Sequence, residues 1–304
     1  MAPPTLVFLH GRGQEFKDPQ KMRRRWLGAL NAGLTQAGAD PLPADRTVLP
    51  FYGNVLYRAT TESAGKPLRL ESTRDLDEPG PFDPGTDPEV GALERRLLAD
   101  MARNAGMAVP APDEPRRTAD RPGGGRLHEE GITDVLSWGA ARELLVTLAK
   151  RSRVDQLIIT AHLRDVAVYL SHGRNEVLEA VRAGIPDGTP LVLVTHSLGT
   201  VVARDLLHDD DVRRRTTLWV TAGSPLGLDA VQDNLLDRGR RHPGTKWLSA
   251  YDVNDVVALG HPLQGSWGRP LTDVDVENDT DPHAITRYLA HARVAGPIRE
   301  AASA

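Results

Sequence analysis

The sequence Leu191-Val-Leu-Val-Thr-His-Ser-Leu-Gly199 places a serine between two segments of different character. Residues 191–195 form an apolar run that is typical of a buried parallel strand, and residues 198–208 are expected to form a helix. A sharp turn from a strand into a helix strains the backbone and points the side chain at the turn outward, as in a nucleophile elbow. We therefore predict that Ser197 is a nucleophile.

The neighbours of this serine only partly match the pattern that such a turn favours. Small residues two positions before and two positions after the nucleophile avoid a collision in the turn. Gly199 meets this requirement, whereas Thr195 stands where glycine is more usual. A threonine is compatible with the turn if its side chain points away from it.

The start of the expected helix supplies groups that would stabilise a negative charge. The first N–H groups of a helix have no partner within it and carry a partial positive charge. The N–H of Leu198 would thus donate to an oxyanion formed at Ser197. We expect a second donor from the loop His10-Gly-Arg-Gly13, at the N–H of Gly11 or Arg12. The alternative for this loop is a plain tight turn.

A serine nucleophile needs a general base, and the base needs an acid that orients it. Two aspartates, Asp252 and Asp255, follow the expected strand 245–250. Catalytic groups gather at the carboxyl ends of parallel strands, so either carboxylate is suitably placed. We favour Asp255, because the apolar residues after it would anchor its loop. Asp252 is the alternative acid, and it would otherwise stabilise the turn through backbone N–H groups.

Three histidines follow these acids. His261 is only six residues beyond Asp255, too close to return to the serine from the other side. His283 stands at the expected start of a helix after a long acidic loop, where an imidazole can reach over the edge of the sheet. His291 lies about two turns into that helix and is expected at the surface or in packing. We therefore assign the base to His283.

Strand-like and helix-like segments alternate along the chain. We expect strands at 5–9, 46–52, 191–195, 217–221 and 245–250, and helices from Asp18-Pro19 to Gly38 and at 88–106, 133–151, 163–170, 174–183 and 198–208. Apolar strands that alternate with helices favour a mostly parallel sheet with helices on both faces. The sequence therefore predicts an α/β fold.

Residues from about 54 to 130 are rich in turn-forming residues. We divide the chain into a core of 1–53 and 160–304 and a cap-like insertion of 54–159, in which about 110–125 is expected to be flexible. The apolar stripes of the helices in this insertion are more typical of packing on the sheet than of a lid over a substrate.

The composition excludes several classes of function. The chain has no cysteine, so disulfides, thiolate catalysis and Cys-based zinc sites are ruled out. Its net charge of −4 gives no pull toward nucleic acid, and its arginine clusters are not interleaved with aromatic residues. No window approaches the length of an apolar membrane span, and we expect a cytoplasmic protein. Contact with a membrane surface has no support in the sequence, and a protein partner is left open.

The acids from Asp273 to Asp281 alternate as in a calcium loop. Asn278 and Ala284, however, stand where that loop requires Gly and Glu, so a solvated loop is the better interpretation. We expect no metal and no organic cofactor. His10 and His196 flank the expected site and are candidates for lining its pocket, with local packing as the alternative.

Several of these segments together resemble the α/β-hydrolase superfamily, and in particular its lipase- and esterase-like members. The segment Leu6-Val-Phe-Leu-His-Gly11 resembles their oxyanion loop, and Val194-Thr-His-Ser-Leu-Gly199 resembles their elbow. The segment Gly223-Ser-Pro-Leu226 is similar to the one that follows their next strand, and Asp252-Val-Asn-Asp255 to their acid loop. His283 followed by Tyr288-Leu resembles their catalytic-histidine helix. The resemblance covers roughly residues 4–52 and 163–292.

The resemblance implies hydrolysis of a carboxylic ester through an acyl-enzyme. Ser197 would attack the carbonyl carbon, His283 would take the serine proton, and Asp255 would hold the imidazole. With an insertion able to form a hydrophobic cap, we expect a small-molecule or lipid ester with an apolar acyl group as the substrate. The alternatives are an amidase, peptidase or acyltransferase on the same triad, or a lipase-like effector that a partner activates.

Overall fold

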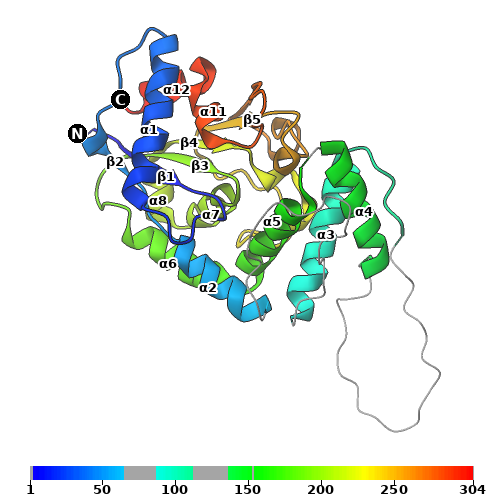
Figure 1. Ribbon diagram of the computed structural model, residues 1–304. Helices are drawn as coiled ribbons and strands as arrows, with labels where there is room; N and C mark the ends of the chain where they lie inside the picture. Colours follow the sequence, from blue (N-terminus) through cyan, green and yellow to red (C-terminus); the bar gives the residue numbers. More distant parts are fainter. Residues whose placement is uncertain (1–2, 65–86, 112–135, 153, 304) are drawn as a thin grey trace, which may run out of the picture.

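The sheet of this protein is six-stranded and entirely parallel, in the order β2-β1-β3-β4-β5-β6 (Figure 1). The computed structural model describes residues 3–64, 87–111, 136–152 and 154–303. The strands are β1 (Thr5–Leu9), β2 (Thr47–Val48), β3 (Leu191–His196), β4 (Thr216–Ala222), β5 (Trp247–Tyr251) and β6 (Leu271–Asp275). All connections are therefore crossovers, as a parallel sheet requires.

Alternate side chains of the strands point into two separate hydrophobic cores. In β1, Leu6 and Phe8 belong to one core, whereas Val7 and Leu9 belong to the other. A strand that is buried on both faces must be apolar at every position, which explains the continuous run of apolar residues in its sequence.

Helices cover both faces of the sheet (Figure 1). One face packs against α1 (Pro19–Gln36), α11 (Ile285–Ala290) and α12 (Ala292–Ala301). The other face packs against α2 (Gly53–Ala64), α3 (Pro88–Asn104), α4 (Trp138–Ser152), α5 (Gln156–Val168), α6 (Arg174–Ala183) and α7 (Leu198–Leu206). This arrangement confirms the predicted α/β class.

Shorter elements join these layers. The short helices are α8 (Asp210–Arg215), α9 (Asp229–Gln232) and α10 (Gln264–Trp267), and a π-helical turn, Tyr169–Gly173, joins α5 to α6. Single 3-10 turns form at Ala44–Arg46, Pro225–Gly227 and Val256–Ala258. No helix in the described ranges is both long and apolar enough to cross a lipid bilayer.

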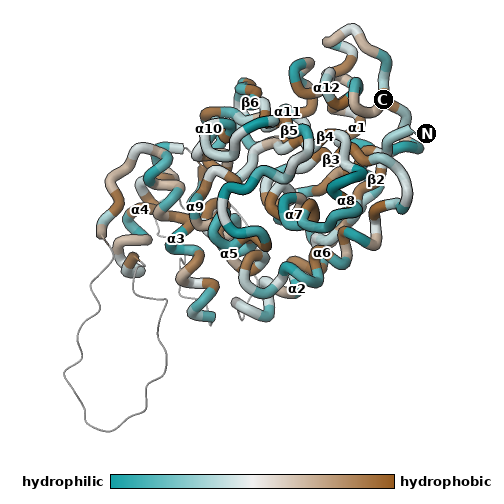
Figure 2. Tube along the Cα trace, turned by 180° about the vertical axis from the view of Figure 1, so that it is seen from behind, coloured by the Kyte–Doolittle hydropathy of each residue, from teal (hydrophilic) through white to brown (hydrophobic). Residues whose placement is uncertain are grey.

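The described helices of the expected insertion, α2, α3 and α4, share a core with the sheet. Buried residues of all three, such as Leu56, Leu97 and Leu145, belong to the same cluster as Val7 and Leu193 of the strands. Along α3 and α4, apolar and hydrophilic residues alternate at short intervals (Figure 2), as in helices that bury one face. These helices therefore pack onto the globular core.

The local sequence explains where two of the long helices begin. Asp18 accepts hydrogen bonds from the backbone N–H groups of Gln20 and Lys21 at the start of α1, and a proline occupies the first helical position. Asp87 caps α3 in the same way, again followed by a proline. An aspartate cap satisfies N–H groups that the helix leaves unpaired, and proline has no N–H to lose there.

Two strand predictions differ from the structure. The strand expected at 46–52 is reduced to the two residues of β2, because its last residues turn into α2 at Gly53. The segment from Asp273, predicted as part of a solvated loop, instead continues the sheet as β6, with Leu271 and Val274 buried. Most of the expected flexible stretch at 110–125 and the start of the helix at 133–151 fall outside the described residues.

Candidate active site

Loops from four strands meet at the carboxyl-terminal edge of the sheet. Gly11 follows β1, Ser197 follows β3, Asp255 follows β5 and His283 follows β6. In the strand order, β1 and β3 are neighbours, so the Gly11 loop lies beside Ser197. Open parallel sheets bind ligands at this edge. The four residues predicted from the sequence to form the site therefore lie where such sheets bind their ligands.

The backbone of Ser197 adopts a conformation that residues other than glycine rarely occupy, with φ 54° and ψ −131°. It is the residue at which β3 ends and α7 begins. Its Oγ is buried and has no hydrogen-bond partner within the described ranges. The strained turn is the arrangement that the sequence predicts at Ser197, whereas a hydrogen bond from its hydroxyl to the predicted base, His283, is not formed in the described structure.

Gly199 allows α7 to pass close to β1. A Cβ atom on Gly199 would lie 2.4 Å from the carbonyl oxygen of Leu9 and 2.5 Å from that of His10. Neither backbone atom can move far without breaking the sheet. The glycine two residues after the serine is therefore required by the packing of the helix against the neighbouring strand.

Thr195 occupies the position before the serine where glycine is more usual, and its side chain points sideways. Its hydroxyl donates to the carbonyl oxygen of Val220 at 2.7 Å and accepts from Nε1 of Trp219 at 3.1 Å, both on β4. The side chain is fully buried between the strands. Thr195 thus leaves the turn clear and ties β3 to β4.

A second hydroxyl pair braces the turn from the helix side. Thr200 donates to the carbonyl oxygen of Ser197 at 2.7 Å, and its oxygen lies 2.7 Å from Oγ of Ser224. All three residues are buried. Sequence reasoning did not select Thr200 or Ser224, because their role depends on contacts between α7 and the loop after β4.

The loop after β1 comes close to the serine at Gly11. A Cβ atom at this position would lie 2.8 Å from Cβ and 3.2 Å from Oγ of Ser197, so the approach needs a glycine. As the first residue of α7, Leu198 has an N–H that lies outside the helical hydrogen-bond pattern. Of the residues whose N–H groups are expected to bind an oxyanion, Leu198 therefore lies at the start of α7, directly after Ser197, and Gly11 and Arg12 lie in the loop after β1.

The side chain of Arg12 anchors this loop to the helices. Its Nε lies 2.5 Å from Oδ2 of Asp165 on α5, and Oγ1 of Thr60 on α2 donates to the other carboxylate oxygen at 3.0 Å. The ion pair is largely buried, with 18% and 13% of the two side chains exposed. The backbone of Arg12 is thereby fixed beside the serine. The sequence offers no signal that joins residues so far apart.

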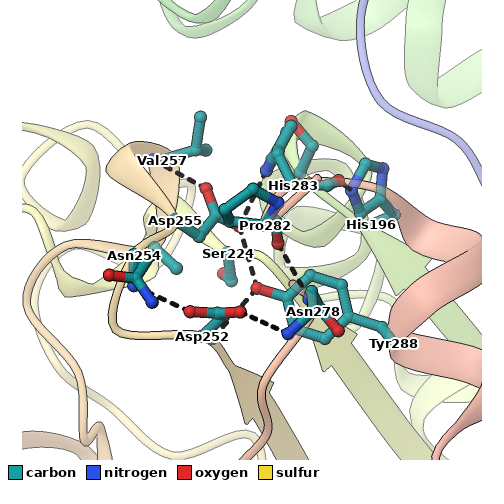
Figure 3. A network of polar contacts seen from close by, with 12 residues as sticks. His196, Ser224, Asp252, Asn254, Asp255, Val257, Asn278, Pro282, His283 and Tyr288 are labelled. Atoms are coloured by element: carbon teal, nitrogen blue, oxygen red, sulfur yellow. Dashed lines mark hydrogen bonds and ion pairs between the residues drawn. The ribbon is translucent and has the colours of Figure 1, made fainter. Parts of the chain in front are cut away.

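His283 and Asp255 form a hydrogen-bonded pair. Nδ1 of His283 lies 2.8 Å from Oδ2 of Asp255, and the hydroxyl of Tyr288 donates to the same oxygen at 2.9 Å (Figure 3). The other carboxylate oxygen accepts from the N–H of Val257 at 2.9 Å. Burial would raise the pKa of Asp255, but the charge of His283 and these three hydrogen bonds outweigh it and lower that pKa. Asp255 is thus an ionised acceptor for the imidazole.

Asp252, the alternative acid, has a different task. Its carboxylate accepts from the N–H of Asn254 at 2.8 Å and from the N–H of Asn278 at 2.6 Å (Figure 3). It therefore joins the loop after β5 to the loop after β6. Of the two aspartates, the structure places Asp255 beside the imidazole and Asp252 against the backbone of the loops.

The other downstream histidines also make local contacts. Nδ1 of His261 lies 2.6 Å from the carbonyl oxygen of Ala258, and His291 joins α11 to α12 with Nε2 3.1 Å from Oδ1 of Asn278. The helix expected to begin at His283 starts two residues later, at Ile285, so His283 lies on the loop before it.

Gly223 connects the serine with the histidine–aspartate pair. The N–H of Ser197 donates to the carbonyl oxygen of Ala222 at 3.0 Å, so the serine lies directly beside the end of β4. A Cβ atom on the next residue, Gly223, would lie 2.7 Å from Oδ2 of Asp255 and 3.0 Å from Nδ1 of His283. The pair therefore rests on the backbone that adjoins Ser197.

Of the two histidines predicted to line the pocket, His10 is buried and His196 is partly buried, and both are hydrogen-bonded. His10 stacks on Tyr52 with ring centroids 4.0 Å apart, and its Nε2 accepts from the N–H of Tyr52 at 3.2 Å. Nε2 of His196 lies 2.8 Å from the carbonyl oxygen of His283, so its N–H fixes the loop that carries the imidazole. Burial lowers the pKa of His10 to about 4 and that of His196 to about 3.

A histidine that sequence reasoning missed lies close to the pair. His162 on α5 is 4% exposed, and its ring centroid lies 6.5 Å from that of His283. Burial, with the nearby His283 and Arg12, lowers the pKa of His162 to about 3, so this imidazole is neutral at physiological pH. It comes from a helix next to the segment that we predicted to be an insertion, and only its packing reveals its place.

The arrangement supplies a hydroxyl, an oriented imidazole and backbone donors at one edge of the sheet. Within the described ranges, no group of three or more His, Asp or Glu side chains could hold a metal ion. Comparisons with protein-family models, with curated proteins and with solved structures give no match to this chain. The assignment of a function therefore rests on the geometry of the site.

Proposed function

We propose that this protein is a serine hydrolase with an α/β-hydrolase fold that cleaves carboxylic esters through an acyl-enzyme. The observation that carries the proposal is the pairing of His283 with the buried, ionised Asp255 beside the strained turn at Ser197. A nucleophile, a base and an acid that orients the base are the parts that acyl transfer by a serine requires. They stand in the chain order serine, aspartate, histidine that α/β-hydrolases have.

In the proposed reaction, Asp255 occupies Nδ1 of His283, which leaves Nε2 to accept the proton of Ser197 as its oxygen attacks the carbonyl carbon. The N–H groups of Leu198 and of Gly11 or Arg12 donate to the oxyanion of the tetrahedral intermediate. His283 then protonates the departing alcohol and afterwards activates a water molecule, which releases the acid and restores the serine.

Labelling of the serine tests the proposal. A fluorophosphonate probe should react with the folded wild-type chain, and the modified peptide should contain Ser197. Ser197→Ala should abolish both the labelling and the hydrolysis of p-nitrophenyl acetate. Ser266 on α10, whose hydroxyl bonds locally to the carbonyl oxygen of Leu263, provides a matched control, and Ser266→Ala should be labelled as the wild type is. Folded wild-type protein that is not labelled and hydrolyses no p-nitrophenyl ester would exclude the proposal.

The same triad serves amidases, peptidases and acyltransferases, and the leaving group and acceptor separate these classes. Comparison of p-nitrophenyl acetate with p-nitroacetanilide measures the preference for an ester over an amide. Addition of an alcohol as a competing acceptor measures acyl transfer through the product ester. We expect the ester to be the better substrate and water to be the main acceptor.

A further inference from the structure

A small cleft, open to solvent, lies beside the oxyanion loop. Gly11 and Arg12 form one side of it, α2 contributes Tyr57 and Thr60, and α5 contributes Asp165. Ser197 does not line the cleft, but Gly11, which does, lies against Ser197, so the cleft adjoins the proposed nucleophile. The lining of the cleft therefore bears on the substrate of the proposed hydrolase.

The lining is mixed, with polar and apolar surface in about equal parts. It carries the guanidinium groups of Arg12 and Arg164, the carboxylates of Glu15 and Asp165, and the hydroxyls of Tyr57, Thr60 and Thr61, while Leu56 and Ala161 are its aliphatic side chains. An alkyl chain placed here would remove water from charged groups without replacing their hydrogen bonds, which is costly. The cleft is thus better suited to a group that carries both hydroxyls and C–H surface than to the purely apolar acyl group that we expected from the sequence.

The charges in the cleft are balanced. Arg12 is paired with Asp165 at 2.5 Å, and Arg164 is paired at 2.7 Å with Glu94. An anionic group would meet the carboxylate of Glu15, and a cationic group would meet the guanidinium of Arg12. A neutral group that can both donate and accept hydrogen bonds avoids both conflicts.

Unused hydrogen-bonding capacity faces this space. In the described part of the chain, the carboxylate of Glu15 and the hydroxyl of Tyr57 have no hydrogen-bond partner, and Arg12 uses only its Nε. These groups offer acceptors and donors, which is the combination that an alcohol hydroxyl can satisfy on both sides.

Tyr57, which lines the cleft, is paired with a second aromatic residue, Phe16, outside the lining. Phe16 follows Glu15, is 76% exposed and has a φ of 59°, a conformation that costs energy in a bulky residue. Its ring meets that of Tyr57 edge to face, with centroids 5.1 Å apart. Aromatic faces beside hydroxyl-binding groups can contact the C–H face of a ring while its hydroxyls are hydrogen-bonded.

From these features we infer that the cleft binds a neutral, hydroxyl-rich group of the ester, as in an acylated sugar or another cyclic polyol. Glu15 and Tyr57 determine this specificity, with Arg12 as a donor. The inference rests on the proposed function, since it names the substrate class of the same serine. It assigns hydrogen bonds, together with contact to C–H groups, to the part of the substrate that lies in the cleft.

Two pairs of substrates test the inference by proton release from the full-length protein. The first pair is methyl 6-O-acetylglucoside and cyclohexylmethyl acetate, which differ in the alcohol. The second pair is methyl quinate and methyl cyclohexanecarboxylate, which differ in the acid. We expect the hydroxylated member of one pair to have a kcat/KM at least about tenfold higher than its cyclohexyl partner, which also shows on which side of the ester the hydroxyls lie.

Variants of the lining locate the effect. Glu15→Gln and Tyr57→Phe should each lower the preference for the hydroxylated substrate by roughly five- to tenfold, because each removes a hydrogen bond to it. Glu179 is an exposed residue of α6 outside the cleft, and Glu179→Gln should keep the wild-type preference. The preference is a ratio, so a general loss of folded protein does not change it.

Three outcomes overturn the inference. They are a preference for the cyclohexyl member in both pairs, a higher kcat/KM for acetylcholine than for the acetylglucoside, and a preference that neither variant changes. In each of these cases, labelling of Ser197 and turnover of p-nitrophenyl acetate would still stand, so the proposed function would survive. If the serine is not labelled and no ester is hydrolysed, the proposed function fails and the inference fails with it.

Discussion

Gly223 and Asp255 lie so close that a single Cβ atom on the glycine would be 2.7 Å from the carboxylate oxygen that binds His283. Gly223 also has a φ of 56°, in the region that favours glycine. The pairing of the aspartate with the imidazole therefore depends on a residue without a side chain directly after the neighbouring strand β4.

Gly223→Ala should accordingly disturb the active site. The added methyl group would displace Asp255 and His283, and a shift of about 1 Å in a catalytic group costs about a hundredfold in rate. The measurement is kcat for p-nitrophenyl acetate, with circular dichroism to verify folding. Gly28→Ala on α1, where nothing lies within 4 Å of the new atom, is the matched control. A wild-type rate in the folded G223A protein would contradict the expected crowding.

Asp255→Asn and Asp252→Asn should separate the two acids. Asp255→Asn removes the charge that orients and stabilises the imidazolium, so the rate should fall about 10⁴-fold with little change in structure. Asp252→Asn weakens hydrogen bonds between two loops, so it should lower the free energy of unfolding by about 1 kcal/mol and the rate far less. The assignment of the acid would be reversed if the larger loss of rate came from Asp252→Asn.

Thr195→Val should reduce stability. The substitution removes one hydrogen bond to the carbonyl oxygen of Val220 and leaves Nε1 of Trp219 without its partner in a fully buried place. Each unsatisfied buried group costs about 1–3 kcal/mol, which urea unfolding can measure. Thr195→Ser keeps the hydroxyl and should lose clearly less. Equal losses in the two variants would show that the methyl group matters and the hydrogen bonds do not.

The buried histidines should make stability depend on pH. The pKa of His10 is lowered to about 4, and those of His162 and His196 to about 3, chiefly by burial. In the unfolded chain these groups titrate near pH 6.5, so from about pH 6.5 down to 4 the unfolded state binds protons that the folded state does not. The free energy of unfolding therefore falls as the pH falls, by up to about 1.4 kcal/mol per pH unit for each histidine.

Urea unfolding at pH 7.5 and at pH 5.0 measures this dependence. His261 and His242 also have lowered pKa values, so His162→Gln removes one of several such groups and should make the loss between the two pH values smaller. Its stability at pH 7.5 is compared with that of the wild type, so that the change in slope is separated from any constant loss of packing. A slope equal to that of the wild type would show that His162 is already protonated or exposed in the folded state.

The local part of the site could be predicted from the sequence. The turn at Ser197 is specified by an apolar strand, a helix and Gly199 within nine residues, and the glycine at position 11 follows its strand directly. Such short-range patterns depend on backbone geometry, which neighbouring residues determine. Long-range side-chain contacts do not leave such a pattern: Tyr288 beside Asp255 and Asp165 beside Arg12 are visible only in the folded chain.

The parallel α/β architecture was equally accessible, because two-sided burial makes its strands continuously apolar. The exceptions are instructive in physical terms. β2 contributes only two residues to the sheet, and β6 is buried only at Leu271 and Val274. A strand with so few buried positions carries too few apolar residues to be distinguished from a polar loop by its sequence.

The acids of β6 have a consequence for how this protein behaves in a crowded solution. β6 forms one border of the sheet, and a border strand presents unpaired backbone groups to any chain that it meets. Asp275 is exposed there, while Asp273 accepts from the N–H groups of Leu263 and Gln264 and thus holds a neighbouring segment against the strand. The negative charge of Asp275 and the segment held by Asp273 would together hinder a strand of a second molecule from pairing with β6 and forming an aggregate.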